Sequence, residues 1–303
     1  MQTATYLGTS GWSYPSGYGK WRGIVYPPKW HGDELAYYAD RFSSVEVNSS
    51  FYRLPTIDTV RGWLQRTPNS FLFSVKLFRK FTHPDFYARE ANRSSTITPD
   101  DVAAMHCVLA PLAERGRLGA LLVQYPDSFR QTADNLSKLV RTLAYFREYP
   151  LAVELRHSGW DNKQVDEVLA HFSAARVRLD EPLYQNMTTA YTNTSAIEYW
   201  RFHGRNAHEW QKTGDNSRRY DYLYTGEEIR ELANNVEQQS KPGKKRMMFF
   251  NNHYHGQAIA NAVSLAAVLG LPMQFDRFSN LVIRFPDLAP IVGRGGEQLR
   301  MLD

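Results

Sequence analysis

Two periods of hydrophobic residues alternate along the chain. Segments in which apolar residues fill every position or every second position predict strands, and they lie at residues 6–12, 44–48, 71–76, 118–124, 151–156, 176–180, 196–203 and 246–252. Segments with apolar residues three and four positions apart predict helices, and these lie at residues 33–42, 60–64, 102–116, 136–143, 165–172, 229–236 and 256–269. Strands and helices therefore follow one another through most of the sequence.

Strands that alternate with helices predict parallel pairing, because a helical crossover returns the chain to the same end of the sheet. Eight such strands are typical of a (β/α)8 barrel of the TIM type, and an open, doubly wound sheet is the alternative. No linker or break in composition divides the chain. We expect one TIM-barrel domain over residues 1–303, with residues 271–303 as a C-terminal extension packed on the barrel, and long loops after the first, third and seventh strands.

Most predicted strands begin with apolar residues and end in a polar group. These groups are Ser10, Glu46, Asn48, Lys76, Gln124, Glu154, Arg156, Asp180, Arg201, His203, Asn251 and Asn252. In a TIM barrel the C-terminal ends of the strands meet on the face where active sites are built. For each residue alone, the alternative is a strand end that meets solvent. Polar groups at nearly all of the strand ends together favour a functional site.

The segment at residues 44–52, SVEVNSSFY, shows this design most clearly. In a strand Glu46 and Asn48 point to one side while Val45 and Val47 point to the other. A carboxylate and an amide then share one face, and Val45 and Val47 supply the packing on the other. The segment predicts functional residues at the strand end and, beyond it, Tyr52.

Composition narrows the class of protein. The 303 residues are 43% hydrophobic and 22% charged, which is typical of a globular chain with a sizeable core. The formal net charge of +5 favours anionic partners only mildly. The single cysteine, Cys107, excludes an internal disulfide, and residues 1–5 have neither the basic nor the apolar region that a leader would show. The longest weakly polar run, at residues 258–273, is too short to span a bilayer. We therefore expect a cytoplasmic protein with no membrane partner.

Several short motifs occur in order along the predicted strands. They are GTSGW at 8–12, WRG at 21–23 with YP at 26–27, EVNSSFY at 46–52, TH at 82–83, Gln124 with Pro126, ELRH at 154–157, Asp180 with Pro182, RFHG at 201–204 and NN at 251–252. In this set the chain resembles the YecE-like proteins, the family of unknown function numbered 72, from about residue 6 to 262. The resemblance implies a TIM-type barrel and no established activity. The chain departs from the family pattern in the residues just before Trp160, and His253 and Tyr254 follow the paired asparagines at positions where the family is variable.

Acid/base catalysis is the first chemistry that these residues suggest. Two carboxylates in unequal environments hold different pKa values and divide the work of hydrolysis. Glu46 is our first choice for this role, with Asn48 orienting it, and Glu154 is the second. The alternative is that Glu154 forms a buried ion pair with Arg156 or Arg201 and stabilises the barrel end.

A metal site is the second chemistry. Hard or borderline ligands occur at several predicted strand ends or in the loops that follow, namely Glu46, Glu154, Asp180, His83 and His203. Three cations at the same level, Lys76, Arg156 and Arg201, oppose a metal ion, and no spaced ligand motif is present. We expect no cofactor, with a divalent metal as an open alternative and with His203 equally well read as a hydrogen-bonded core histidine.

Anion binding is the third chemistry. The loops at residues 13–32, 78–93 and 204–224 interleave basic and aromatic residues. Guanidinium groups hold phosphate or carboxylate, and flat rings stack on bases or sugars. Such loops suit a sugar phosphate or a nucleic-acid strand, whereas the alternative is a solvated basic rim with aromatic residues packed beneath it.

Together these patterns predict an enzyme of the hydrolase or isomerase kind that acts on a phosphorylated or sugar-containing substrate. We expect catalytic roles for Glu46, Glu154 and His203. We expect binding roles for Ser10, Trp12, Asn48, Tyr52, Lys76, His83, Gln124, Arg156, Asp180, Arg201, Asn251 and Asn252. Among these, Lys76, Arg156 and Arg201 would form a basic floor that binds an oxyanion. The alternative is a non-catalytic protein that binds nucleic acid or an anionic ligand, with an affinity that falls steeply as salt rises.

Overall fold

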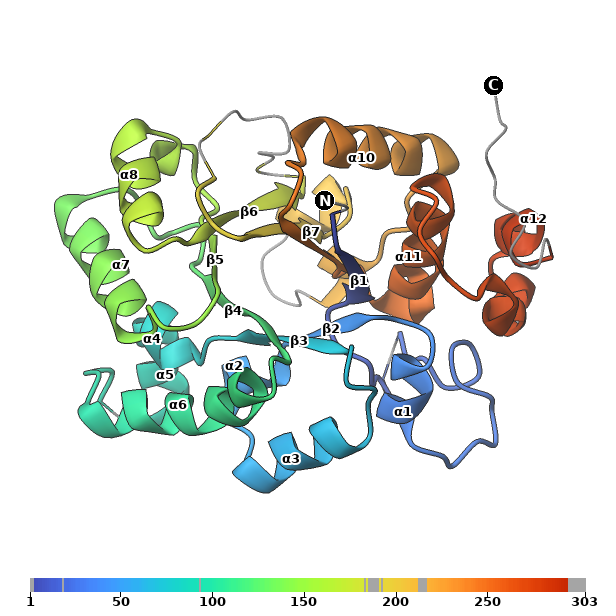
Figure 1. Cartoon of the computed structure of the whole chain (residues 1–303), viewed down its shortest axis with the longest axis horizontal. Helices are drawn as coiled ribbons and strands as arrows, with labels where there is room; N and C mark the ends of the chain where they lie inside the picture. The colour runs from blue at the N-terminus through green and yellow to red at the C-terminus, as the bar shows by residue number, and fades with distance from the viewer. Residues whose placement is uncertain are drawn as a thin grey trace.

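Eight parallel strands form the centre of the computed structural model, which describes residues 3–17, 19–92, 94–182, 184, 191, 193–211 and 217–293 (Figure 1). The strands are β1 Thr5–Thr9, β2 Ser44–Val47, β3 Leu72–Lys76, β4 Leu118–Gln124, β5 Leu151–Glu154, β6 Ala175–Asp180, β7 Ile197–Phe202 and β8 Lys245–Phe250. They are arranged in the order β1-β8-β7-β6-β5-β4-β3-β2. Residues 18, 93, 212–216 and 294–303, which the predicted loops and extension include, lie outside the described residues.

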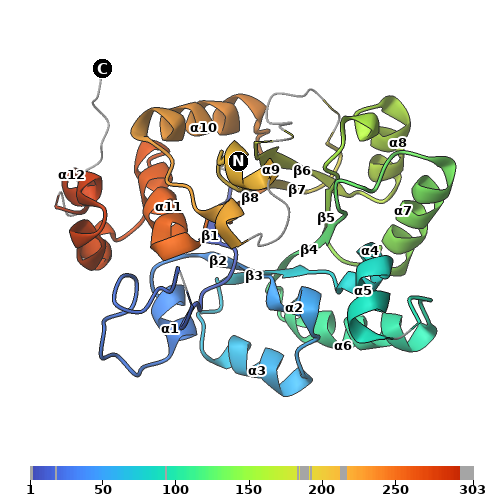
Figure 2. The ribbon, with the colours of Figure 1, turned by 180° about the vertical axis from the view of Figure 1, so that it is seen from behind.

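Helices surround the strands. The longer ones are α1 Glu34–Ala39, α3 Ile57–Gln65, α5 Pro84–Ala91, α6 Pro99–Glu114, α7 Ala133–Tyr145, α8 Lys163–His171, α10 Gly226–Gln239 and α11 Gln257–Val268. Short helices occupy the loops that follow strands, namely α2 Ser49–Tyr52, α4 Arg79–Thr82, η1 Ser158–Trp160, α9 Ala207–Gln211, η2 Ser217–Tyr220 and η3 Tyr254–Gly256. Figure 2 shows α2, α4 and α9 on the face of the barrel that is seen from behind. The loops after β1, β3 and β7 are long, as the sequence predicts.

The predicted (β/α)8 barrel is confirmed, and the open sheet is excluded by the way β1 meets β2. A parallel bridge joins Ser10 to Glu46 just beyond β1, so the first and last strands of the sheet order meet at their C-terminal ends. Below this bridge Tyr38 enters from α1. Its hydroxyl accepts a hydrogen bond from the backbone N–H of Thr9 at 2.7 Å and donates to the carbonyl of Ser44 at 3.1 Å. A side chain thus completes the ladder between two strands.

Close approach of the two strands also explains a glycine. A Cβ at Gly8 would lie 2.0 Å from the carbonyl oxygen of Ser44, a distance that no side chain tolerates. At the next turn of the chain, Gly11 has a φ of 91°, which ends the extended backbone of β1 two residues after Thr9. The strand predicted to reach residue 12 therefore ends at Thr9.

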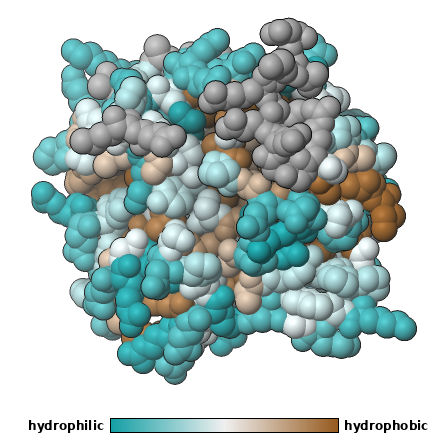
Figure 3. Space-filling model, turned by 45° about the vertical axis from the view of Figure 1, so that its right-hand side comes forward, coloured by the Kyte–Doolittle hydropathy of each residue, from teal (hydrophilic) through white to brown (hydrophobic). Residues whose placement is uncertain are grey.

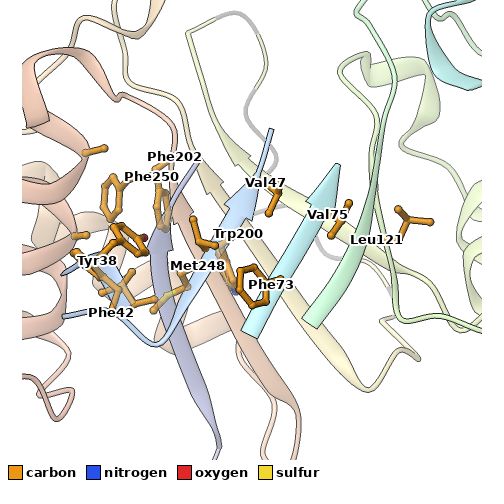
Figure 4. Packing of buried hydrophobic residues seen from close by; sticks show 14 of the residues in the cluster. Tyr38, Phe42, Val47, Phe73, Val75, Leu121, Trp200, Phe202, Met248 and Phe250 are labelled. Carbon is orange, nitrogen blue, oxygen red and sulfur yellow. The ribbon is translucent and has the colours of Figure 1, made fainter. Parts of the chain in front are cut away.

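Side chains alternate between two cores. Inside the barrel lie the inward-facing residues Leu72, Ala120, Leu122, Ala152, Ala175, Val177, Leu179, Ile197, Tyr199, Met247 and Phe249. Between barrel and helices lies a larger layer, part of which Figure 4 shows: Val47, Phe73, Val75, Leu121, Trp200, Phe202, Met248 and Phe250 from the strands, with Tyr38 and Phe42 near α1. Residues one apart in a strand thus face different environments.

The described part of the C-terminal extension contacts the barrel layer through η4 Phe275–Ile283, η5 Pro286–Leu288 and α12 Ala289–Val292. Phe278 packs edge-on against Phe42 at 5.5 Å, and the Asn280 amide donates to the carbonyls of Ile24 and Val25. In Figure 3, hydrophilic residues cover most of the visible face. Within the described residues, the helices are too short or too polar to cross a membrane.

Candidate active site

A chain of buried charges crosses the barrel at the level where the strands end. Arg201, in β7, lies between two carboxylates: its Nε and Nη2 donate to Oε2 and Oε1 of Glu46 at 2.9 and 2.7 Å, and its Nη1 donates to Oε2 of Glu154 at 2.5 Å. Arg156 donates from Nε to Oε1 of Glu154 at 2.6 Å. Both carboxylates are fully buried. Charges in such a position persist because they are paired and hydrogen-bonded.

Two hydroxyl groups use the remaining acceptor capacity of Glu46. Ser10 donates to Oε1 at 2.6 Å and Tyr199 to Oε2 at 2.8 Å. With the two bonds from Arg201, Glu46 accepts four hydrogen bonds, which is the usual capacity of a carboxylate. A proton from a substrate would have to displace one of these donors.

Glu154 is held in its charged form as well. Burial alone would raise the pKa of this carboxyl, but the guanidinium groups of Arg156 and Arg201 more than offset it and hold the pKa below its ordinary value. The two carboxylates expected as acid/base groups are therefore ion-paired. This geometry matches the ion-pair alternative, with Arg201 as the partner that the two share.

A cavity of about 510 Å³, which we call the basin, opens at the same end of the barrel. It is lined by Gly11, Trp12, Ser13, Tyr14, Asn48, Ser49, Tyr52, Lys76, Gln124, Tyr220, Asn251 and His253. Six of the residues predicted to bind ligand are among them: Trp12, Asn48, Tyr52, Lys76, Gln124 and Asn251. Its lining combines rings with amide groups and one lysine, and neither Glu46 nor Glu154 contributes to it.

His203 lies among the charges rather than in the basin. Its Nε2 is 3.2 Å from Nη2 of Arg156 and 3.4 Å from Nη1 of Arg201, and both of these groups can only donate. We therefore assign the ring proton to Nδ1, which lies 2.9 Å from Nδ2 of Asn251. Because Nδ2 can only donate, this assignment turns the Asn251 amide over, so that its oxygen accepts the proton of Nδ1. Burial and the two guanidinium groups keep the pKa of His203 well below its ordinary value, so the ring is neutral.

Lys76 is the one ammonium group among the described residues that line the basin. Its stem is half-buried, and Nζ lies 4.3 Å from the ring centre of Phe51. Burial lowers the pKa of Lys76 to about 7, and the charge of Arg201 acts in the same direction. The amine is therefore partly neutral at physiological pH.

A metal site finds no support in this arrangement. Among the described residues, no three side chains of His, Cys, Asp or Glu are grouped in a way that could hold a metal ion. The oxygens of Glu46 and Glu154 are bound by arginine, and His83 and His203 stand next to cations. We assign no metal to the site.

Most of the chain matches proteins of a known family. The model of a family described as a protein of unknown function, DUF72, matches residues 6–279. The chain belongs to the DUF72 family. The resemblance seen in the sequence motifs is thereby confirmed.

Among the curated relatives, the UPF0759 protein YunF of Bacillus subtilis is 26% identical in an alignment of 295 residues, which covers 90% of this DUF72 chain and 99% of YunF. The crystal structure of a DUF72 protein from Thermotoga maritima superimposes with a TM-score of 0.70 at 34% identity, over 88% of this chain and 99% of that one. One from Enterococcus faecalis gives a TM-score of 0.74 at 26% identity, over 88% of this chain and 96% of that one. None of these names states an activity.

Two predicted residues of the DUF72 chain point away from the basin. Asp180 accepts bonds from Nε and Nη2 of Arg205, at 2.6 to 3.1 Å, and from the hydroxyl of Tyr224 at 2.8 Å. Asn252 donates to Asn261 on α11 at 2.8 Å. Asp180 in β6 and Asn252, two residues beyond β8, both fall at positions whose side chains point outward. They therefore join the barrel to the layer around it.

His83 lies at the edge of a second cavity. This groove, of about 780 Å³, runs between α4, α5 and α7. The ring of His83 packs edge-on against Phe51 at 4.9 Å, and its Nδ1 is 2.8 Å from the hydroxyl of Thr82. Burial and the nearby charge of Lys76 lower the pKa of His83 to about 3. The residue is neutral and does not line the basin.

Sequence reasoning missed Tyr14, Tyr220 and His253 as basin residues. Tyr14 and His253 stack at 4.4 Å with an angle of 10° between their planes, and Tyr220 lies 5.5 Å from His253. They come from the loops after β1, β7 and β8, which meet only in the folded chain. The aromatic loops gave a general signal, but no pattern identified these positions.

Glu181 was also missed, although it follows the predicted residue Asp180. It is 1% exposed, its Oε2 lies 3.5 Å from Nε of Arg156, and this oxygen has no hydrogen-bond partner in the described structure. Burial raises the pKa of Glu181 to about 7. Strand alternation could have found it, because Val177 and Leu179 face the barrel interior and Glu181 continues that phase.

Proposed function

We propose that this DUF72 protein is an enzyme that binds a small sugar-containing substrate, phosphorylated or not, in the basin. The observation that carries the proposal is the lining: aromatic rings, amide groups and one partly neutral lysine share a cavity of about 510 Å³ at the C-terminal strand ends. Pockets of this volume hold small molecules, and this end of the barrel is where its enzymes act.

Each kind of lining residue has a role in the proposal. The rings of Trp12, Tyr14 and Tyr220 line the basin and offer apolar surface to the C–H side of a sugar. The amides of Asn48, Gln124 and Asn251 offer donors and acceptors to its hydroxyl groups. The Asn48 Oδ1 supports this role because it is buried without a hydrogen-bond partner in the described structure.

The buried charges below the basin, on Glu46, Glu154, Arg156 and Arg201, stabilise the barrel end and set the electrostatic field of the basin in this proposal. Every nitrogen of Arg201 already donates to a carboxylate, so this residue is a weak candidate for holding a substrate oxyanion. Lys76 is the group of the floor that reaches the basin. Acid/base work, or attack on the substrate, then falls to Lys76 rather than to Glu46 or Glu154.

Ligand binding tests this proposal. We expect pentoses, hexoses or their phosphates to raise the melting temperature of the wild-type protein, and Tyr52→Ala to weaken the effect severalfold. Tyr52 is 61% exposed at the basin, so its loss should leave folding intact. Ile57→Ala is the matched control, since Ile57 is a 43% exposed apolar residue that does not line the basin.

Two outcomes would contradict the proposal. One is a panel of sugars and sugar phosphates that leaves the melting temperature of the wild type unchanged. The other is tight binding of an oligonucleotide with a steep loss of affinity in salt, unaffected by Tyr52→Ala, which is the behaviour of a nucleic-acid binder.

A further inference from the structure

The position of Lys76 is fixed by its backbone. It ends β3, and its carbonyl accepts a hydrogen bond from the hydroxyl of Ser50 at 2.6 Å. The next residue, Leu77, donates its backbone N–H to the carbonyl of Leu122 in β4 at 2.9 Å. A reactive group on a clamped strand end is held more accurately than one on a loop.

The side chain of Lys76 reaches the basin without a carboxylate partner. No ion pair joins its Nζ to an acidic group in the part of the chain that the structure describes, although Glu46 and Glu154 belong to the same floor. Arg201 and Arg156 occupy these carboxylates. Lys76 therefore has no carboxylate of its own among the described residues, and the charge of Arg201 opposes its protonation.

The ring of Phe51 contacts the amine of Lys76. Its centre lies 4.3 Å from Nζ, a contact that favours the ammonium form, while burial and Arg201 favour the neutral form. The net result is a pKa lowered to about 7. Enzymes prepare a lysine for nucleophilic attack in this way, by desolvation or by a neighbouring cation.

We propose that Nζ of Lys76 is a nucleophile that forms an imine with the carbonyl carbon of an open-chain hydroxyaldehyde or hydroxyketone held in the basin. The inference rests on the proposed function, because it concerns the same cavity, and it adds the class of substrate. The substrate is a sugar in its carbonyl form, and a sugar alcohol of the same length would bind without reacting.

The step is balanced as follows. The lone pair of the neutral amine attacks the carbonyl carbon, and the π electrons of the C=O bond move to oxygen, which takes up one proton that the nitrogen loses. The resulting carbinolamine loses its hydroxyl group together with the second proton of the nitrogen as water, while a C=N bond forms to Nζ. The products are one imine and one water molecule, and no oxidant or reductant is needed.

The lining around Lys76 fits this substrate class. Val47 in β2 pairs with Val75 in β3, so the residues that follow, Asn48 and Lys76, end neighbouring strands. The unpaired Oδ1 of Asn48 and the amide of Gln124 can then bind hydroxyl groups next to the carbonyl. A hydroxylated carbon chain makes use of these amides, whereas a plain alkyl aldehyde does not.

Reductive trapping tests the inference. We incubate the wild-type protein with glyceraldehyde and sodium cyanoborohydride at neutral pH and map the modified lysines by mass spectrometry. We expect the secondary amine at Lys76 to form at least about tenfold faster than at Lys163, whose side chain is 91% exposed. The rate at Lys76 should rise with pH around a midpoint near 7, as the amine loses its proton.

A second arm separates this inference from the function on which it rests. Thermal shift with sorbitol, which has no carbonyl group, reports binding without reaction, and only the part of the shift that Tyr52→Ala removes counts as binding in the basin, because polyols also stabilise proteins nonspecifically. If sorbitol or a sugar phosphate stabilises the protein while Lys76 is modified no faster than Lys163, the imine inference is overturned and the proposed function stands. If neither polyol nor sugar phosphate binds and Lys76 remains unmodified, both fail. Lys76→Arg keeps a cation at this position and should abolish the adduct without preventing folding.

Discussion

Replacing Arg201 by methionine is expected to lower the free energy of unfolding by about 5 kcal/mol or more. The guanidinium group makes two hydrogen bonds to Glu46 and one to Glu154, and all three side chains are buried. Its loss leaves Glu46 with no opposite charge, and breaking one buried pair alone costs about 3–5 kcal/mol. Since a domain is stable by only about 5–15 kcal/mol, much of the variant should be unfolded, as measured by urea titration.

Arg61→Met is the control for this variant. Arg61 pairs with Asp58 on the surface, where the two side chains are 61% and 85% exposed, so its loss should change stability by less than about 1 kcal/mol. Adding Glu46→Gln to Arg201→Met removes the stranded charge and should recover part of the loss. An Arg201→Met protein as stable as the wild type would show that the ion pairs of Arg201 with Glu46 and Glu154 do not stabilise this end of the barrel.

The second large effect is expected for Glu46→Gln. Four donors point at the carboxylate oxygens, and the amide group of glutamine would present N–H groups to some of them. We expect a loss of about 3–5 kcal/mol, again by urea titration. A variant that keeps its stability but loses turnover would return Glu46 to the acid/base role that the sequence first suggested.

Glu181→Gln is the matched control, with the same chemical change at a second buried carboxyl. Burial raises the pKa of Glu181 from 4.5 to about 7, so between these values the folded state binds a proton that the unfolded state lacks. Glu181 therefore contributes a slope of falling stability as pH rises through this window. Glu181→Gln removes that slope, and at pH 8 it should be as stable as the wild type or more so. A loss equal to that of Glu46→Gln would show that burial alone, rather than the pairing with Arg201, sets the cost.

The barrel was predictable because its strands and helices carry clear periods and because most strands end in polar residues. The alternation of side chains along each strand also predicts which of two neighbouring polar residues points into the barrel. In β6 the inward phase runs through Val177 and Leu179 to Glu181, whereas the predicted Asp180 faces outward. The same rule separates Asn251, which lines the basin, from Asn252, which bonds to α11.

Other features of the site depend on the folded chain. Arg201 could have paired with any of several carboxylates at the strand ends, and only the geometry assigns it to both Glu46 and Glu154. The aromatic wall of the basin brings the loop of Tyr14 against those of Tyr220 and His253, which follow more than 200 residues later in the sequence, so no local pattern could predict it. The sequence identifies Lys76 as a cation at a strand end. That it has no carboxylate partner among the described residues follows only from the structure, in which Arg156 and Arg201 occupy Glu46 and Glu154.

The central claim is that Lys76 presents a partly neutral amine to the basin above ion-paired carboxylates. An NMR titration tests it most directly, with the ε-carbons of lysine labelled with carbon-13 and the Lys76 signal assigned by its absence in Lys76→Arg. We expect this signal to titrate with a pKa of about 7 in the free protein. A midpoint near the ordinary lysine value of 10.5 would contradict the claim, because Lys76 would then be a plain surface cation.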